Sequence, residues 1–278
     1  MKFKKLLQDK LKDKIGSSLL DYIPGSYQII GDICLIKLKK EVVGHKELIG
    51  EAILDILPYI KTVCLISRVE GELRVPKIEK IVGDGTEVLH KENRCSFYLD
   101  VSEIMWSKGN QQEKRRLVKL VKDGETIIDM FAGVGYWSIP IARNKNVKIY
   151  SIELNPKSYS YLKKNVKLNK VEDKVNPIKG DCRKEIPKLE KVDRIIMGYF
   201  PRTIDYLEYA LRGAKDECWI HFHEIRKLGE WDKLQRDIVN ILTKHKFGLI
   251  EFRFNRVKKY APNVDHAVFD LRIKRKPV

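Results

Sequence analysis

Cysteine is scarce in this sequence, and the few cysteines follow no recognisable pattern. There are five among 278 residues, and they lie far apart, at Cys34, Cys64, Cys95, Cys182 and Cys218. No two have the C-x-x-C spacing of a zinc ribbon or a redox-active disulfide. An odd number of scattered cysteines is typical of reduced thiols inside a cell. A chain of this length can bury roughly three quarters of its unfolded surface, so it needs no disulfide to fold.

Long apolar runs are also missing, and none is long enough to span a bilayer. The first segment, MKFKKLLQDKLKDKIG, carries too many charges for the apolar core of a signal peptide. We therefore expect a soluble, cytoplasmic protein that does not bind a membrane.

Acidic residues are too few to balance the basic ones. The chain has 55 Lys and Arg against 38 Asp and Glu, a formal net charge of +17. Proteins from hot environments also have many charged residues, but this does not explain such an excess of one sign. An anionic partner is indicated, with nucleic acid as the first candidate. A membrane surface is the second, but the chain lacks a long basic amphipathic helix with bulky aromatics, so we expect no membrane partner. Candidate phosphate contacts are Lys2, Lys4, Lys5, Arg115, Arg116, Lys258 and Lys259.

The N-terminal third mixes short helical and extended patterns. Apolar spacing predicts helices at 3–15 and 45–60, and Pro58 should end the second one. Strands are predicted at 27–30, 34–38, 62–68 and 95–101, and the first two flank Gly31-Asp32 as a hairpin. The segment 71–85 is charged and punctuated by turn residues. We expect a smaller α+β domain over residues 1–105.

From about residue 124, strands alternate with helices. Strands are predicted at 126–130, 147–153, 174–179, 192–197, 218–225, 249–254 and 266–273. Such alternation indicates an α/β fold, with a parallel sheet covered by helices on both faces. No helix separates the last two strands, so they should pair as an antiparallel hairpin at the sheet edge. This is the seven-stranded arrangement of the Rossmann-like class I methyltransferases, and we expect it over residues 106–278.

Three successive strands end in residues suited to bind a nucleoside. Asp129, Gly133 and Gly135 are candidate cofactor-binding residues, and the two glycines let the backbone turn tightly and approach a ligand. Glu153 can accept hydrogen bonds from two ribose hydroxyls, and Asp181 from an adenine amino group. A dinucleotide fingerprint would need a third glycine, and a P-loop would need Gly-Lys-Ser/Thr. Taken singly, each signal has a purely structural explanation. The glycines mark a tight turn, Glu153 is a charged strand end, and Asp181 is a helix N-cap. Their order after three strands predicts S-adenosylmethionine binding.

Three segments carry a more specific resemblance: Trp106–Arg116, the glycine segment 129–142 and Arg256–Asn263. They resemble the archaeal and eukaryotic family of tRNA (guanine-N1)-methyltransferases and wybutosine-synthesising aminocarboxypropyl transferases. The resemblance covers most of the chain. Members act on the purine 3′ of the anticodon, so it implies tRNA-Phe, through its anticodon stem-loop, as the partner, with the N-terminal part docking on the RNA. Implied cofactor contacts are Ser107, Lys114, Glu153, Asp181 and Cys182.

Within that family, two motifs are similar to the wybutosine branch. The strand at 192–197 is followed by Gly198-Tyr199-Phe200-Pro201, where the methylating members resemble one another in Asn-Leu-Pro. The upstream Ser107-Lys108-Gly109-Asn110, with Glu113 and Lys114, looks like Ser-x-Gly-Asn followed by Glu-Lys. This implies transfer of the 3-amino-3-carboxypropyl group to 4-demethylwyosine, with Gly198–Pro201 near the substrate. A guanine-N1 methyltransferase is the alternative, and a non-catalytic RNA-binding protein is a second one.

The physical chemistry of these residues agrees with that implication. The Ser107 hydroxyl and the Lys114 ammonium could bind the methionine carboxylate, although Lys114 could also be a solvated helix residue in a basic run. We nominate no catalytic base, because an electron-rich carbon acceptor has less need of one. His221 and His223 share a strand face with each other, and Glu224 follows them. A third ligand is not evident, so we expect no metal, and we infer no protein partner.

Overall fold

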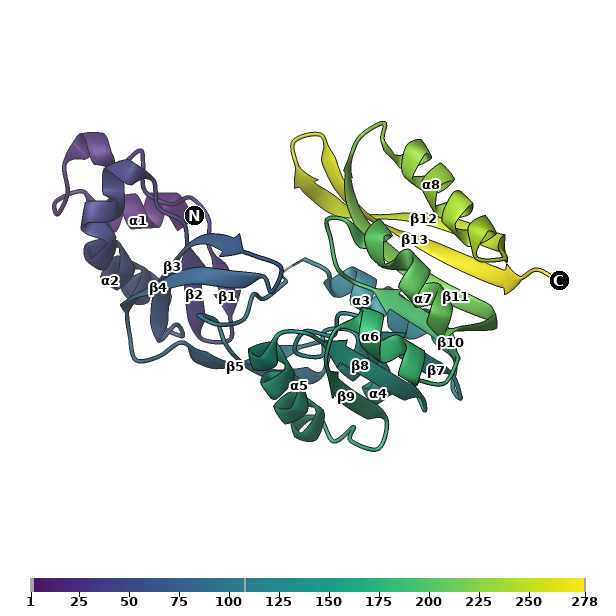
Figure 1. The fold of residues 1–278 in the computed structure, drawn as a ribbon. Helices are drawn as coiled ribbons and strands as arrows, with labels where there is room; N and C mark the ends of the chain where they lie inside the picture. The colour runs from purple at the N-terminus through teal and green to yellow at the C-terminus, as the bar shows by residue number, and fades with distance from the viewer. Residues whose placement is uncertain (1–2, 108, 278) are drawn as a thin grey trace. The chain divides into compact units, whose positions relative to one another are not determined.

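The chain forms two compact units, and the structure, a computed structural model, describes residues 3–107 and 109–277. The N-terminal unit comprises Met1–Glu92 and Ser96–Lys108, and the C-terminal unit comprises Asn93–Cys95 and Gly109–Val278 (Figure 1). Each unit has a hydrophobic core of its own. Within the described residues, we find no helix with the length and apolar character needed to cross a membrane.

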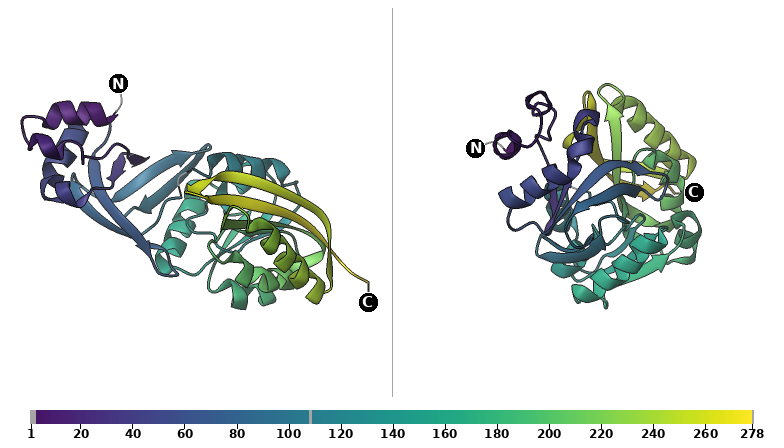
Figure 2. Two further views of the ribbon diagram at one scale, coloured as in Figure 1. Left: turned by 90° about the horizontal axis from the view of Figure 1, so that it is seen from above. Right: turned by 90° about the vertical axis from the view of Figure 1, so that its left-hand side faces the viewer.

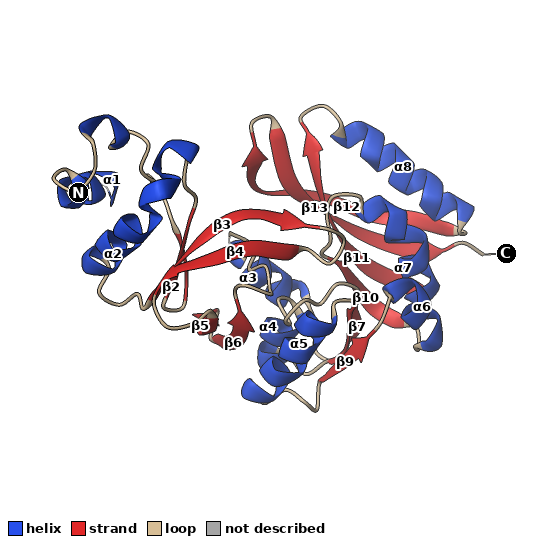
Figure 3. Ribbon diagram, turned by 60° about the vertical axis from the view of Figure 1, so that its left-hand side comes forward, coloured by secondary structure: helices blue, strands red, loops and turns tan. Residues whose placement is uncertain are grey.

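The N-terminal unit contains a four-stranded sheet of order β1-β2-β3-β4 and a separate hairpin, β5-β6. Figure 3 shows its helices beside the strands. Leu7 and Leu11, together with Ile49 and Ile53, are fully buried in its core. The elements are α1 (Phe3–Leu11), η1 (Ser17–Leu19), β1 (Gln28–Ile30), β2 (Ile33–Ile36), η2 (Lys40–His45), α2 (Lys46–Ile56), β3 (Thr62–Glu70), β4 (Val75–Val82), β5 (Glu87–Glu92) and β6 (Cys95–Asp100).

Most of these elements follow from turn and helix signals. The hairpin around Gly31 is confirmed, since β1 and β2 pair antiparallel. Helix α1 ends at Leu11, earlier than predicted, and α2 ends at Ile56, just before Pro58. The sequence does not predict β4 or β5. Several of their residues are exposed charged ones, so neither strand has the apolar face that marks a half-buried strand.

The C-terminal unit is built on a seven-stranded sheet of order β12-β13-β11-β10-β7-β8-β9. Its strands are β7 (Thr126–Asp129), β8 (Lys148–Glu153), β9 (Val175–Lys179), β10 (Val192–Met197), β11 (Ala214–Lys227), β12 (Phe247–Ala261) and β13 (Val264–Arg275). The strands β7 to β11 pair in parallel, whereas β13 pairs antiparallel with β11 and β12. All seven predicted strands and the antiparallel edge hairpin are confirmed. The hairpin, yellow in Figure 2, is longer than predicted.

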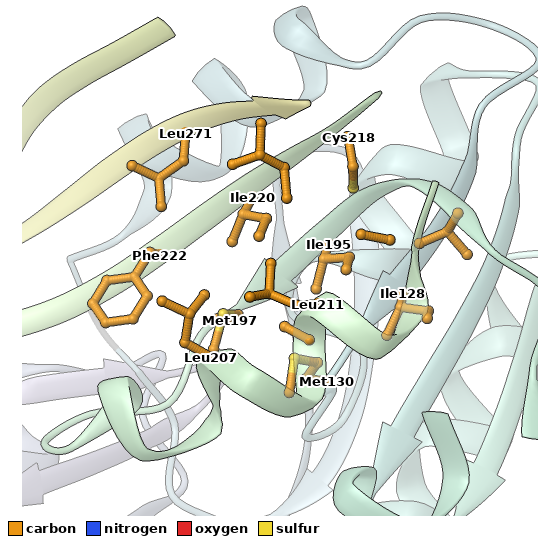
Figure 4. Close-up of a cluster of buried hydrophobic side chains, with 14 of the residues drawn as sticks. Ile128, Met130, Ile195, Met197, Leu207, Leu211, Cys218, Ile220, Phe222 and Leu271 are labelled. Atoms are coloured by element: carbon orange, nitrogen blue, oxygen red, sulfur yellow. The ribbon is translucent and has the colours of Figure 1, made fainter. Parts of the chain in front are cut away.

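One face of this sheet is apolar and is covered by helices that follow β9, β10 and β11. Ile128, Ile195 and Ile220 pack there against Leu207 and Leu211 (Figure 4). The helices of the unit are α3 (Gln111–Leu120), α4 (Ser138–Asn144), α5 (Pro156–Leu168), α6 (Cys182–Glu185), η3 (Ile186–Lys188), η4 (Thr203–Tyr206), α7 (Leu207–Gly213) and α8 (Trp231–Lys244). The core cluster on this face includes side chains of α6, η3, α7 and α8.

The opposite face carries polar side chains, because successive residues of a strand point to opposite sides. Asp270 lies on β13 between the apolar-face residues Phe269 and Leu271, and it is fully buried. Its carboxylate accepts hydrogen bonds from Arg116 of α3, at 2.5 and 3.0 Å, and from His221 of β11, at 2.6 Å. Arg116 also donates to both oxygens of Glu113 at 2.7 Å. Arg194 of β10 lies 2.6 Å from Nε2 of His221 and donates to both oxygens of Glu125, at 2.6 and 2.8 Å. We refer to these six residues as the buried charge network: Glu113, Arg116, Asp270, His221, Arg194 and Glu125.

This network overturns the prediction that Arg116 contacts RNA phosphate. Two carboxylates hold its guanidinium, and its side chain is only 27% exposed. A phosphate would have to compete with both carboxylates in a partly desolvated site. The network also shows why His221 is not a solvent-facing strand residue: its ring lies between Asp270 and Arg194.

Candidate functional site

The loop after β7 is a tight turn that only glycine can form. Gly133 has a φ of 58° and Gly135 a φ of 101°. A Cβ on Gly133 would lie 2.3 Å from Cε2 of Tyr136, and one on Gly135 would lie 2.4 Å from Cδ1 of Ile139. Both glycines are therefore required by φ and by space. They bring the backbone to the carboxyl end of the sheet, where open α/β sheets bind ligands.

Glu153, the last residue of β8, faces this glycine loop. Its carboxylate accepts hydrogen bonds from the backbone N–H of Gly133 and that of Asn155, both at 2.7 Å. Burial raises the pKa of Glu153, and these hydrogen bonds oppose the rise. Each carboxylate oxygen keeps acceptor capacity for a further donor. The side chain is thus fixed at the sheet edge and still able to accept from two hydroxyls.

Asp181 caps α6, which begins at Cys182, so the prediction that it is a helix N-cap is confirmed. Its carboxylate accepts from the backbone N–H of Arg183 at 2.9 Å and also binds the Arg183 guanidinium. The hydrogen bond from Arg183 lowers the pKa of Asp181. Burial raises the pKa of the Cys182 thiol to about 12, so the thiol stays neutral. The backbone N–H of Cys182, rather than its sulfur, is the group suited to a ring nitrogen.

Asp129 lies deeper than the other acidic residues and is fully buried. The Ser138 hydroxyl donates to its carboxylate at 2.6 Å, and the Ser151 hydroxyl donates to Ser138 at 2.7 Å. Burial raises the pKa of Asp129 to about 7. These bonds tie the end of β7 to the start of α4 and to β8. Asp129 thus holds the start of the glycine loop in place, and its contact with a cofactor remains a prediction.

The segment after β10 forms an aromatic surface beside the glycine loop. The ring of Tyr199 stacks on that of Phe131 at 5.0 Å between centroids, and Tyr206 meets Phe131 edge-on at the same distance. A Cβ on Gly198 would lie only 2.6 Å from Nε1 of Trp137. The indole of Trp137 thus fills the space that a side chain at position 198 would need. Aromatic faces of this kind suit the stacking of a base.

The far end of this segment rests on buried polar groups. Phe200 packs on His266, with 4.5 Å between ring centroids, and His266 lies 3.2 Å from His223, nitrogen to nitrogen. The backbone N–H of Thr203 donates to the Glu224 carboxylate at 3.0 Å. His223 and Glu224 therefore belong to the support of the loop that contains Pro201. Across residues 3–107 and 109–277, no three His, Cys, Asp or Glu side chains are grouped as a metal site.

The burial of Lys114 contradicts the alternative that this lysine is a solvated helix residue. Only 2% of it is exposed, and its ammonium lies 5.3 Å from the ring centroid of Tyr136. Sequence reasoning missed Tyr136, although its place next to Gly135 pointed to the loop. Ser107 lies in the N-terminal unit, so its contact with a cofactor remains a prediction. Lys2 and Lys108 lie outside the described residues.

Comparison with known proteins assigns these features to one family. A family model described as the TRM5/TYW2 methyltransferase domain matches residues 88–250, and one described as the TYW2 N-terminal domain matches residues 7–86. The chain is 37% identical over 256 residues to the tRNA(Phe) (4-demethylwyosine(37)-C(7)) aminocarboxypropyltransferase of Methanocaldococcus jannaschii. That similarity covers 90% of this chain and 98% of the relative.

Two further similarities bear on the fold and on the choice of reaction. The structure of Pyrococcus horikoshii TYW2 in complex with MeSAdo superposes with a TM-score of 0.84 at 32% identity, covering 99% of this chain and all of that one. The tRNA (guanine(37)-N(1))-methyltransferase Trm5b of Pyrococcus abyssi is 34% identical over 267 residues, which cover 93% of this chain and 78% of the relative. The predicted class I methyltransferase fold with a smaller N-terminal domain is confirmed.

Proposed function

The chain belongs to the TRM5/TYW2 methyltransferase-domain family, and from this we propose that it is a tRNA aminocarboxypropyltransferase. It transfers the 3-amino-3-carboxypropyl group of S-adenosylmethionine to 4-demethylwyosine, the base 3′ of the anticodon in tRNA-Phe. The γ-carbon of the methionine chain leaves the sulfonium and bonds to a carbon of the base. 5′-Methylthioadenosine is released, and the base carbon loses a proton. The cofactor supplies an activated carbon–sulfur bond and thus the leaving group.

One observation supports this reaction over methylation, namely the contact between Gly198 and Trp137. Because the indole occupies the space beside Gly198, position 198 has no room for a side chain such as the asparagine of the Asn-Leu-Pro motif. An amide at this place would steady the base whose N1 is methylated. Its absence suits a carbon acceptor that is already electron-rich. The residues then act mainly by positioning, which can supply about 7–11 kcal/mol of barrier reduction.

We assign the cofactor contacts from the geometry of the loop ends. Glu153 accepts from the ribose hydroxyls, and Asp181 accepts from the adenine amino group while the N–H of Cys182 meets a ring nitrogen. A Cβ on Gly133 or Gly135 would fill space in the glycine loop. The two glycines therefore give the nucleoside room to approach the backbone. Lys114 binds the methionine carboxylate, and the family resemblance, not the geometry, implies Ser107 as a further contact. Tyr199 and Phe200 lie nearest the acceptor base.

The reaction can be read directly with two labelled cofactors. One carries its label in the S-methyl group, the other in the methionine carboxyl carbon. With tRNA-Phe that contains 4-demethylwyosine, the carboxyl label should enter the RNA and the methyl label should leave in 5′-methylthioadenosine. Methyl label in the RNA, together with S-adenosylhomocysteine in solution, would instead establish the guanine-N1 type of methyl transfer.

We propose further that the enzyme acts in the cytoplasm of an archaeon and binds the anticodon stem-loop without a protein partner. The N-terminal unit, residues 1–105 in our prediction, docks on the RNA. Lys5 and Lys259 are exposed, as is Arg115, whose guanidinium also donates to Asn93 at 3.3 Å. With Lys4 and Lys258, these residues remain the candidate phosphate contacts.

Binding of tRNA should weaken as salt increases, because phosphate contacts release counterions. Each contact contributes about 0.7–0.9 to the slope of log affinity against log salt, so affinity should fall at least about tenfold between about 50 and 200 mM salt. Filter binding or fluorescence anisotropy would measure this, and Lys259→Ala should lower the slope by about one. An affinity that does not change with salt would exclude phosphate contacts as the main source of binding.

A further inference from the structure

Helix α5 carries positive charge only. Five lysines lie between Pro156 and Val171, and this stretch contains no aspartate or glutamate. An exposed helix face usually mixes both signs, because opposite charges three or four residues apart attract each other and like charges repel. Helix α8 follows that rule, since it has two exposed aspartates close to Lys233 and Arg236. The need for a soluble surface therefore does not explain why α5 has one sign only.

Three of these lysines form an exposed surface that we call the α5 lysine face: Lys163, Lys167 and Lys170. Lys163 and Lys167 are four residues apart and thus on the same side of the helix, and Lys170 follows the helix end. Among the described residues, no carboxylate forms an ion pair with any of the three. Lys163 lies over the ring of Tyr159, 5.2 Å from its centroid. Like charges at this spacing destabilise a helix, and no carboxylate of the described chain offsets them.

Lys170 occupies a backbone position that favours glycine. Its φ is 55°, in the left-handed region, and it directly follows the C-cap Asn169. Its N–H donates to the carbonyl of Lys167 at 3.0 Å, and the N–H of Val171 donates to that of Val166 at 3.2 Å. This is a Schellman motif, in which glycine is the usual residue at this position because it has no Cβ. A lysine here is less favourable for the fold than glycine, which points to a role of its side chain outside folding.

The place of α5 in the fold connects this surface with the carboxyl edge of the sheet. The helix begins three residues after Glu153 and packs against β8 and the edge strand β9 (Figure 1). Its 13 residues extend about 20 Å from that edge toward the opposite one. Arg143 of α4 is exposed and donates to the carbonyl of Asn169 at 3.2 Å, so a further cation lies at the helix end. Glu172 and Asp173 come next in the chain and limit the basic surface there.

We propose that the α5 lysine face binds the phosphate backbone of the substrate tRNA. The proposal rests on the proposed function and adds a contact surface to it, since none of the phosphate contacts predicted from the sequence lies on α5. An ammonium group on a flexible stem suits a phosphate as a point charge and reads no base. An RNA strand whose acceptor base lies at the carboxyl edge can follow α5 away from that edge. The lysines thus position the RNA and do not select the base.

Paired variants test the assignment. Lys163→Gln/Lys167→Gln should weaken the binding of full-length tRNA-Phe about tenfold or more at about 0.1 M salt, and lower the slope of log affinity against log salt by about 1.5–2. In transfer assays the KM for tRNA should rise and kcat should stay unchanged. The control is Lys233→Gln/Lys244→Gln, which removes the same charge from the exposed face of α8 and should change neither affinity nor slope.

A third variant, Lys170→Gly, separates RNA binding from folding. Glycine removes the ammonium group and suits the left-handed backbone, so the melting temperature should stay equal or rise. The variant should nevertheless bind tRNA more weakly, with a salt slope lower by about one. Calorimetry with S-adenosylmethionine should give the wild-type affinity for every variant, because α5 holds no group assigned to the cofactor.

Two outcomes would overturn the assignment. One is an unchanged tRNA affinity and salt slope in Lys163→Gln/Lys167→Gln. The other is an equal loss in the α8 control, which would show that only the net charge matters. In either case the proposed function stands, since the wild-type protein still binds tRNA. If the wild-type protein binds no tRNA, the proposed function fails together with this assignment.

Discussion

Replacing Asp270 with alanine should lower the free energy of unfolding by about 3–5 kcal/mol, the cost of breaking a buried ion pair. Its carboxylate accepts from Arg116, from His221 and, at 2.9 Å, from Asn255. Removing it leaves the Arg116 guanidinium to face Glu113 alone and leaves an N–H of His221 buried without an acceptor. Urea denaturation followed by circular dichroism would measure the change.

A matched control separates burial from charge. Asp216 also pairs with an arginine, Arg275, but 86% of its side chain is exposed. Asp216→Ala should therefore cost at most about 1 kcal/mol. If Asp270→Ala does not fold, Asp270→Asn should fold with an intermediate loss, since it keeps one acceptor. A loss below about 1 kcal/mol for Asp270→Ala would show that the network contributes little to stability.

The loss of unfolding free energy in Asp270→Ala should also depend on pH, in the direction set by the pKa of Asp270. Burial raises the pKa of Asp270, but the hydrogen bonds from His221 and Arg116 outweigh burial and hold the pKa below its ordinary 3.8. A carboxyl group whose pKa is lowered by folding contributes its stability above the unfolded-state pKa. The difference between wild type and Asp270→Ala should thus be constant from pH 7 to about pH 5. It should shrink as the pH falls below about 4.

Replacing Glu153 with alanine should weaken S-adenosylmethionine binding at least about a hundredfold. Two hydrogen bonds from ribose hydroxyls to a charged carboxylate contribute about 1.5–3 kcal/mol each, and about 1.4 kcal/mol corresponds to a factor of ten. The variant also loses the bond from the N–H of Gly133, which holds the glycine loop in place. Isothermal titration calorimetry would give the affinity, and a thermal scan would show that the variant is folded.

Glu190 provides the control for this measurement. It is an exposed carboxylate that binds Lys148 at the beginning of β8, whereas Glu153 is at the end of the same strand. Glu190→Ala should leave cofactor affinity unchanged. Glu153→Gln, which keeps one acceptor oxygen, should bind with intermediate affinity. Unchanged affinity in Glu153→Ala would remove this residue from the cofactor site.

The sequence predicts the parallel sheet well because most of its strands are short apolar runs bounded by turn residues. The order of Glu153 and Asp181 after successive strands follows from the same pattern. The burial of the charged residues of α3 could not be predicted from such a pattern. Glu113, Lys114 and Arg116 lie in a basic run that resembles a solvated helix, yet Glu113 and Lys114 are buried and Arg116 is largely enclosed.

The partners of those residues explain the difference. Arg116 is bound by Asp270, which lies 154 positions further along the chain. Local spacing holds no information about contacts across such separations, since they exist only once the sheet has formed. For the same reason, the packing of His266 against Phe200 could not be predicted from the sequence around either residue.

Arg194, a member of the buried charge network, also determines the direction of both hydrogen bonds of the His221 ring. An arginine side chain can only donate. The Arg194 guanidinium lies 2.6 Å from Nε2 of His221, so this nitrogen must accept, and the ring proton resides on Nδ1 and points to Asp270. Burial lowers the pKa of His221, which keeps the ring neutral. With the Arg194 donor fixed at Nε2 and the Asp270 acceptor fixed at Nδ1, the imidazole holds one tautomer and cannot relay a proton between the strands that it joins.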